Sequence, residues 1–277
     1  MNLSRPLVLA AVLVLSQAQV QAQALPERIA STRVIKIAVN AIYPPMEFKD
    51  PESGKLIGFD VDLGEALARE LGVTLEWQES AFEQLIPSLA TGRADMILSG
   101  LNDRPARRET MDFVDYLNSG VQFYTLAGRT DVKQPTDLCG KTIGTSRSTA
   151  FPAEIKGWSD TNCVAAGKPP ITVEGTSDNA AARAQLKQER FEGGAQGSET
   201  VPYAMTLEPG IYKPVGTPFG GAQQGIAFAK ADTQLRDAVL GAFRKIIANG
   251  SYAAIVAKWK LQASAVKQAA VNGVPVP

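Results

Sequence analysis

Strand-like and helix-like hydrophobic patterns alternate along the first hundred residues, and this alternation restricts the possible fold more than any other feature. Residues 34–39 (VIKIAV) form a short apolar run typical of a buried strand, and residues 59–71 place large apolar side chains on one helical face. Residues 73–77 and 94–99 predict two further strands, with a short helix over 85–89 between them. Strands separated by helices predict an α/β fold with a parallel sheet, in which ligands bind beyond the carboxyl ends of the strands.

A second α/β unit is predicted in the remainder of the chain. Strand patterns occur at 122–127, 141–145 and 224–229, and helical patterns at 178–188 and 232–249. Asp60 is expected to cap the start of the helix at 59–71. The end of the chain, from about residue 262, is expected to be frayed.

The first 24 residues have the features of a secretory signal peptide. A basic Arg5 precedes an apolar run at residues 7–15, and Ala22 and Ala24 fit a small-x-small cleavage pattern. The alternative, a transmembrane anchor, needs about 20 apolar residues, which this run does not reach. The sequence therefore predicts a protein that is exported to the periplasm and released there.

Charge and residue types exclude several classes of function. Removal of the first 24 residues takes one base and no acid, which leaves acids and bases nearly balanced and argues against nucleic acid as a partner. The chain contains no histidine, which excludes Ser-His and Cys-His catalysis and histidine-bearing zinc sites. We therefore expect neither an enzyme nor a bound cofactor or metal.

The two cysteines, Cys139 and Cys163, predict one disulfide, because an even count in an oxidising compartment favours pairing. Such a bridge would stabilise the fold by roughly 3 kcal/mol. The alternative is a pair of buried free thiols.

Several short motifs resemble the family 3 bacterial extracellular solute-binding proteins, the polar amino-acid receptors of ABC importers. They are YPPMEF at 43–48, GFDVDL at 58–63, LIPSL at 85–89, and residues 94–107 followed by MDF at 111–113. The second half matches more loosely, through DLCGK at 137–141 and QGSE at 196–199. Because these motifs occur in the family's order, the resemblance covers nearly the whole chain after residue 24.

The resemblance implies a two-lobed clamp of the periplasmic-binding-protein type (type II), joined by two hinge strands. Lobe 1 would comprise residues 25–124 and 223–260, lobe 2 residues 125–222, and residues 261–277 a tail. The implied protein is a monomer that captures an amino acid or similar small carboxylate between its lobes. It would then deliver this ligand to an ABC permease in the inner membrane.

The resemblance also implies a site for the ligand's carboxylate. Arg107 stands where the family has an arginine that binds this group, and a guanidinium can form two parallel hydrogen bonds with it. Without the resemblance, Arg107 would be assigned with Arg104 and Arg108 to a solvated basic face. Backbone N–H groups of Ser99, Gly100 and Asn102 would add donors.

Other ligand contacts are implied on both lobes. Tyr43 and Phe82 match aromatic walls around the ligand side chain, although core packing is the usual place of such rings. Ser148 and Thr149 match a lobe 2 turn that donates to the carboxylate, although a plain turn before a helix explains them equally well.

Three positions depart from the family pattern. Asn102 replaces the usual Ser or Thr, and Asn40 replaces an acid that meets basic ligands in some relatives, which argues against a Lys- or Arg-like ligand. Gly197 stands where the family has an acid that binds the α-ammonium group. Either Ser198 or Glu199 replaces this acid, or the ligand lacks a standard α-amino group.

Two further functions fit the same sequence. One is a periplasmic enzyme of the cyclohexadienyl-dehydratase kind, in which Glu199 would serve as acid or base and Arg107 would hold a carboxylate. The other is a ligand-binding protein that docks on a membrane receptor and takes part in sensing.

Overall fold

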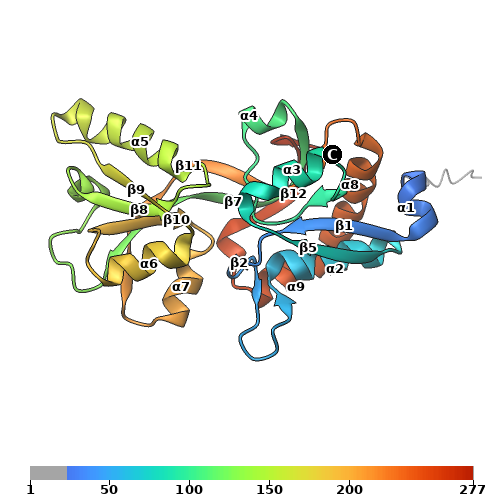
Figure 1. Cartoon of the computed structure of the whole chain (residues 1–277), viewed down its shortest axis with the longest axis horizontal. Coiled ribbons are helices and arrows are strands. Elements are labelled where there is room, and N and C mark those ends of the chain that lie inside the picture. Colours follow the sequence, from blue (N-terminus) through green and yellow to red (C-terminus); the bar gives the residue numbers. More distant parts are fainter. Residues whose placement is uncertain (1–23, 277) are drawn as a thin grey trace, which may run out of the picture.

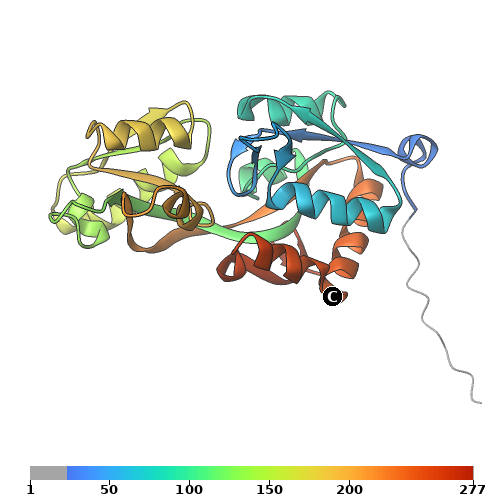
Figure 2. The same cartoon turned by 90° about the horizontal axis from the view of Figure 1, so that it is seen from below.

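The computed structural model describes residues 24–276 and forms two lobes (Figure 1). The predicted signal peptide lies outside the described residues, except for Ala24. Figure 2 shows that segments from both ends of the described chain, drawn in blue and red, lie in the same lobe. None of the described helices is both long enough and apolar enough to cross a membrane.

Lobe 1 is built on the parallel strands β5, β1 and β6, which lie side by side in that order. Parallel strands that are covered on both faces read as continuous apolar runs, as the sequence of β1 does. The bounds of the lobe 1 elements are α1 Glu27–Thr32, β1 Val34–Val39, β2 Ile42–Tyr43, β3 Glu47–Lys49, β4 Leu56–Ile57, α2 Phe59–Leu71, β5 Thr74–Glu79, a 3₁₀ turn Phe82–Gln84, α3 Leu85–Ala90, β6 Met96–Ile97, α4 Pro105–Arg108, α8 Thr233–Ala248 and α9 Ser251–Lys258.

Two apolar cores cover the two faces of the lobe 1 sheet. On one face, Ile35 and Ile37 of β1 pack with Leu63 and Leu67 of α2 and with Phe243 of α8. On the other face, the neighbouring residue Ala38 packs with Leu85 and Leu89 of α3. Because successive strand residues point to opposite faces, one short strand contributes to both cores.

Two long strands connect the lobes: β7, Met111–Leu126, and β11, Tyr212–Ala229. They pair antiparallel with each other along most of their length, so the sheet is mixed rather than purely parallel. Val121 and Phe123 already pack in the core of lobe 2, which places the crossing of β7 a few residues before Tyr124. Residues 212–221, which are rich in Pro and Gly, belong to β11 and were not predicted as a strand.

Lobe 2 repeats the α/β plan with the parallel strands β10, β8 and β9. Its smaller core includes Cys163, which forms the predicted disulfide with Cys139. Helices α5 and α7 were not predicted from the sequence. The bounds are a 3₁₀ turn Pro135–Leu138, β8 Thr142–Ser146, α5 Phe151–Asn162, a 3₁₀ turn Val164–Ala166, β9 Thr172–Thr176, α6 Asn179–Lys187, β10 Gly193–Gly197 and α7 Val201–Leu207.

Two local predictions were wrong. The tail is not frayed: after a 3₁₀ turn at Gln262–Ser264, β12 (Ala265–Val271) pairs with β7 and with β13 (Val274–Pro275), and Ala269 and Ala270 are buried. Their apolar side chains offset the loss of chain entropy. Asp60 does not cap α2, whose N-cap is Gly58; the Asp60 carboxylate instead turns inward, behind the site.

Candidate functional site

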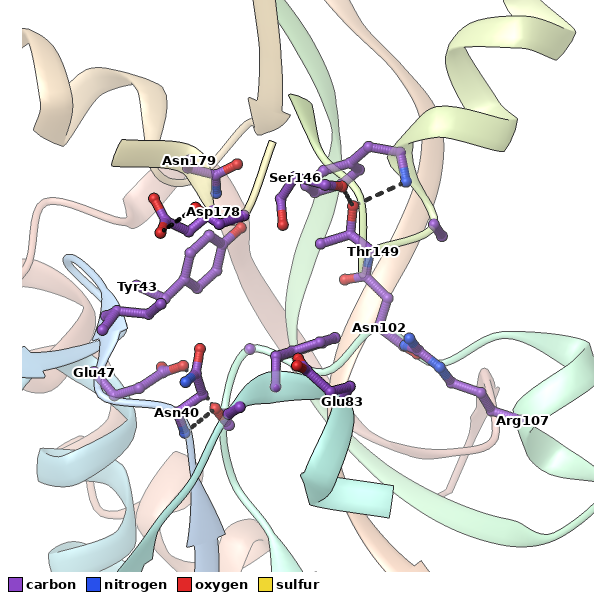
Figure 3. Close-up of a pocket in the computed structure, with 18 residues that line it drawn as sticks. Asn40, Tyr43, Glu47, Glu83, Asn102, Arg107, Ser146, Thr149, Asp178 and Asn179 are labelled. Carbon is purple, nitrogen blue, oxygen red and sulfur yellow. Dashed lines mark hydrogen bonds between the residues drawn. The ribbon is translucent and has the colours of Figure 1, made fainter. Parts of the chain in front are cut away.

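A cavity of about 280 Å³ lies between the lobes and is lined by residues of both (Figure 3). Its lobe 1 side is lined by the end of β1, the loop at Tyr43, the 3₁₀ turn at Phe82 and the segment after β6. Its lobe 2 side is lined by the turn between β8 and α5 and by the start of α6. The cavity therefore lies at the carboxyl ends of parallel strands in both lobes, where the sequence pattern predicted a ligand site.

Buried polar groups fix the floor of the cavity. The Ser99 hydroxyl donates to Glu47 Oε1 at 2.8 Å and accepts from the backbone N–H of Asn40 at 2.9 Å. Burial and the nearby Asp60 carboxylate raise the pKa of Glu47 well above its usual value. Asp60 Oδ2 accepts from the N–H of Gly100 at 2.8 Å, and burial raises the pKa of Asp60 to about 7. This network holds the loop after β6 in place against β1.

Arg107, on α4, presents a guanidinium to the cavity without a carboxylate partner. Its Nη1 donates to the carbonyl oxygen of Asn102 at 2.7 Å, and no residue of the described chain forms an ion pair with it. Burial and the charge of Arg104 lower the pKa of Arg107, but from a value so high that it stays charged. A partly buried cation with unused donors has the chemistry to bind an anion.

Arg104 and Arg108, the two arginines beside Arg107, have partners of their own. Arg108 forms a bidentate pair with Asp103, with distances of 2.6 and 2.7 Å. Arg104 pairs with Glu154 of α5, which belongs to the other lobe. The three arginines therefore differ, and among them only Arg107 lines the cavity.

The lobe 2 side of the cavity combines short polar side chains with the ring of Phe151. Thr149 Oγ1 donates to the carbonyl oxygen of Ser146 at 2.8 Å and accepts from the N–H of Phe151 at 3.2 Å. Figure 3 shows Thr149 on the same side of the cavity as Arg107, and Asp178 on the side of Tyr43. Asp178 caps α6 by accepting from the N–H of Ala181 at 2.7 Å.

Glu199 is buried behind Tyr43 and does not line the cavity itself. Its Oε1 accepts from the Tyr43 hydroxyl at 2.8 Å and from Gln224 Nε2 at 2.7 Å, and its Oε2 accepts from the Ser119 hydroxyl at 2.7 Å. Burial raises the pKa of Glu199, while these hydrogen bonds oppose the rise.

The structure brings together most of the residues that the sequence predicted as a site. Those that line the cavity are Tyr43, Phe82, Ser99, Gly100, Asn102, Arg107 and Thr149. Ser148, Ser198 and Glu199 do not line it; Ser198 instead accepts from the N–H of Gly120 on β7 at 3.1 Å. Their roles as ligand contacts stay predictions.

Five charged or amide residues of the cavity were not predicted as contacts: Glu47, Glu83, Asp178, Asn179 and Asn40, the last of which the sequence marked only as a departure from the family pattern. A signal existed for Glu47 and Glu83, since both lie within or beside motifs that carry the resemblance. Asp178 and Asn179 open a predicted helix, where an Asp usually serves as a cap, so nothing in the sequence marked them as cavity residues.

Comparison with known proteins places the chain in a family. The model of the bacterial extracellular solute-binding proteins, family 3, matches residues 35–262. The arginine-binding protein ArgT of Corynebacterium glutamicum is 32% identical over 253 residues, which cover 91% of this chain and 82% of that protein.

Solved structures agree with this placement. An ancestral arginine-binding protein bound to arginine superposes with a TM-score of 0.73 at 28% identity, covering 82% of this chain and 97% of the other. An ancestral amino-acid-binding protein, described as a precursor of cyclohexadienyl dehydratase, gives 0.74 at 25% identity and covers 84% and 97%. The chain belongs to the family 3 bacterial extracellular solute-binding proteins.

Proposed function

We propose that this protein is the periplasmic receptor of an ABC importer and that it binds an amino acid in the cavity between its lobes. The observation that carries the proposal is Arg107, a partly buried guanidinium that faces the cavity without a carboxylate partner. A charged group in such a place needs an anion of matching geometry, and the α-carboxylate of an amino acid is planar and bidentate. Thr149, on the same side of the cavity, would cover this carboxylate from lobe 2.

The ligand that fits best has a cationic side chain, as arginine does. Glu83 and Asp178 line the cavity as acids, beside Glu47, whose pKa burial raises, whereas Arg107 is the only cation among the described lining residues. This excess of acid favours a ligand whose own charge is positive overall. This excess of acid outweighs the presence of Asn40 where some relatives have an acid, a replacement that on its own favours a neutral ligand.

The lobes would close on the ligand about the two crossing strands. The ligand contacts come from two bodies that are joined mainly by β7 and β11, so a hinge there changes the cavity without disturbing either core. In the closed form the two lobes are brought together, and the permease of the inner membrane would recognise the outer surface of this form. We expect the receptor to act as a monomer after removal of its signal peptide.

Binding can be tested on residues 25–277 after unfolding and refolding to remove any ligand carried from the cell. The ligands are L-arginine, L-lysine, L-histidine and L-glutamine. A ligand at about 100 times its Kd adds about 2.7 kcal/mol of stability, which raises the Tm by roughly 5–10 °C. We expect the largest shift with L-arginine. Arg69→Ala, which removes an exposed arginine of α2, is the matched control for Arg107→Ala.

Three outcomes would contradict the proposal. The absence of a shift with every amino acid would contradict amino-acid binding, and an equal shift in Arg107→Ala would contradict the carboxylate site. Release of water from a cyclic carboxylic acid, abolished in Glu199→Gln, would instead establish an enzyme on this fold.

A further inference from the structure

Two buried carboxyl groups meet beneath the floor of the cavity. Glu47 of β3 is 1% exposed and Asp60 of α2 is 0% exposed. The backbone N–H of Asp60 donates to the carbonyl oxygen of Met46 at 2.8 Å, which holds the start of α2 against β3. The two carboxyl groups lie within hydrogen-bonding distance of each other. Glu47 also lines the cavity, whereas Asp60 lies behind it.

Each of these carboxyl groups has one oxygen with a donor and one without. Glu47 Oε1 accepts from the Ser99 hydroxyl at 2.8 Å. Asp60 Oδ2 accepts from the N–H of Gly100 at 2.8 Å and from the Tyr116 hydroxyl at 2.9 Å. Glu47 Oε2 and Asp60 Oδ1 are buried and accept from no donor of the described chain. A buried polar atom without a partner is costly, and one proton shared between these two oxygens gives each of them a hydrogen bond.

No positive charge offsets the two acids, since none of the ion pairs among residues 24–276 includes either of them. Burial raises the pKa of the Tyr43 and Tyr116 hydroxyls well above the usual value, so both stay neutral. The nearby Glu199 carboxylate disfavours ionisation of Glu47 and Asp60. Two buried carboxylates in contact cannot both be ionised, and the pair therefore binds at least one proton at neutral pH.

The charge of the ligand decides whether this proton stays. Figure 3 shows Glu47 on the side of Tyr43 and Asn40, away from Arg107. A ligand whose carboxylate is bound by Arg107 extends its side chain toward the side of Glu47, and a cation there stabilises the ionised form of this acid. We propose that Glu47 and Asp60 form a proton-exchange pair and that binding of a cationic amino acid releases a proton from it to the solvent.

This inference rests on the proposed function and adds a dependence on pH to it. Because the release of a proton is part of the binding of a cationic ligand, its affinity rises with pH near neutrality. A neutral ligand has no charge to replace the proton, so the pair keeps it and the affinity changes little. The preference for a cationic ligand over a neutral one of the same shape therefore increases with pH.

The test measures the proton release directly. L-arginine and its neutral isostere L-citrulline are titrated by calorimetry at neutral pH in buffers that differ in ionisation enthalpy. The slope of the observed binding enthalpy against that of the buffer gives the number of protons released. We expect about one proton with L-arginine and none with L-citrulline. Below neutral pH, the Kd for L-arginine should increase by up to about tenfold per pH unit.

Two isosteric variants separate the pair from the rest of the molecule. Asp60→Asn keeps the acceptor for Gly100 and Tyr116, and its amide donates to Glu47, which is then ionised before the ligand binds. Glu47→Gln donates to Asp60 in the same way. Proton release with L-arginine should be lost in both variants, and in Asp60→Asn the Kd should be nearly independent of pH. Glu65→Gln, an exposed change on α2, is the matched control and should release the proton as the wild type does.

The proton can also be observed before any ligand is added. Infrared difference spectra of the wild type against Asp60→Asn at neutral pH should show the carbonyl band of a protonated carboxyl group, and the absence of this band would overturn the inference. Release that persists in both variants would also overturn it. The proton would then come from another group such as Asp115, whose pKa burial raises to about 7 and which does not line the cavity.

The two ligands separate a failure of the inference from a failure of the proposed function. Equal proton release with L-arginine and L-citrulline would show that the release follows closure of the lobes rather than the charge of the ligand, against the inference. Binding of L-arginine without any release would refute the inference and leave the proposed function standing. If the wild type binds no amino acid, the proposed function fails, and the inference fails with it.

Discussion

The two lobes share an α/β plan but are stabilised differently. The sheet of lobe 1 has an apolar core on each face, with the long helices α2 and α8 packed on one side and α3 on the other. Lobe 2 has smaller cores, and one of them includes the half-cystine Cys163. A small core buries less apolar surface and therefore contributes less stability. In lobe 2 the disulfide adds to the stability that the smaller cores provide.

The walls that the lobes give to the cavity also differ. Lobe 1 supplies two rings, Tyr43 and Phe82, and the guanidinium of Arg107, whereas lobe 2 supplies one ring, Phe151, and otherwise mainly short polar side chains such as Thr149. Large rigid rings and a cation carry most of the binding energy in a typical site. We therefore propose that lobe 1 holds the ligand and lobe 2 covers it.

The largest expected effect is a difference in ligand affinity between a variant in the lobe 1 wall and a variant in the lobe 2 wall. Arg107→Ala removes the cation that meets the carboxylate, and we expect a loss of about 3 kcal/mol in binding, or roughly 100-fold in Kd. Thr149→Ala removes one neutral donor, and we expect about 1 kcal/mol. Calorimetry with L-arginine measures both. Equal losses would mean that the lobes share the ligand evenly.

The second prediction concerns the disulfide. Replacing both Cys139 and Cys163 by alanine should lower the free energy of unfolding by roughly 3 kcal/mol, because the unfolded chain gains freedom. Hydrogen exchange followed by mass spectrometry should show the lost protection in lobe 2, at β8 and α5, while β1 and α2 keep theirs. A uniform loss across both lobes would show that they unfold as one unit.

Much of the fold could be predicted because its elements follow from local patterns. The helix predicted at 59–71 is α2, with the same bounds, and the strand predicted at 34–39 is β1. The pattern failed where tertiary contacts decide the structure. The Pro- and Gly-rich start of β11 has no strand pattern, yet it pairs with β7, and the short apolar tail becomes a strand because β7 offers a free edge.

The site residues also divide into those that the sequence could predict and those that depend on tertiary contacts. Arg107 was predicted because it stands where the family has an arginine that binds the ligand carboxylate, and Tyr43 because it stands where the family has an aromatic wall. The position of Glu199 behind Tyr43 could not be predicted, since it depends on β10, β7 and β11 meeting at one point. The sequence showed that the acid expected at Gly197 was missing and offered Ser198 or Glu199 as its replacement, without placing either of them.

The third prediction concerns pH, and it also distinguishes the lobes. Burial raises the pKa of Asp60 to about 7, above the value of about 3.9 expected in the unfolded chain. Between these values the folded state binds more protons than the unfolded state, so stability falls as pH rises from about 4 to about 7 and is then constant. Chemical unfolding from pH 5 to 8 should show a loss on the order of 2 kcal/mol.

Asp60→Asn should reduce this dependence, and the remainder should come from groups such as Asp115, whose pKa burial also raises to about 7. Glu65→Gln, an exposed change on the same helix, should leave it intact. The stability that is lost as the pH rises should be lost from lobe 1, where Asp60 lies. A pH profile that is identical in Asp60→Asn and wild type would show that Asp60 is already ionised at pH 5.

The smallest expected effect tests whether the lobes hold each other without the ligand. Arg104 and Glu154 form the only ion pair between lobes among the described residues, and their side chains are 21% and 16% exposed. A pair of this kind contributes about 0.2–1 kcal/mol and weakens with salt. Arg104→Glu should therefore raise the Kd for L-arginine severalfold at low ionic strength, and the double exchange Arg104→Glu with Glu154→Arg should restore it. Because the pair forms only between closed lobes, the unfolding of each lobe should not change. If the double exchange does not restore binding, Arg104 acts on the ligand through its field beside Arg107, and closure depends on the ligand and the Tyr43–Glu199 contact alone.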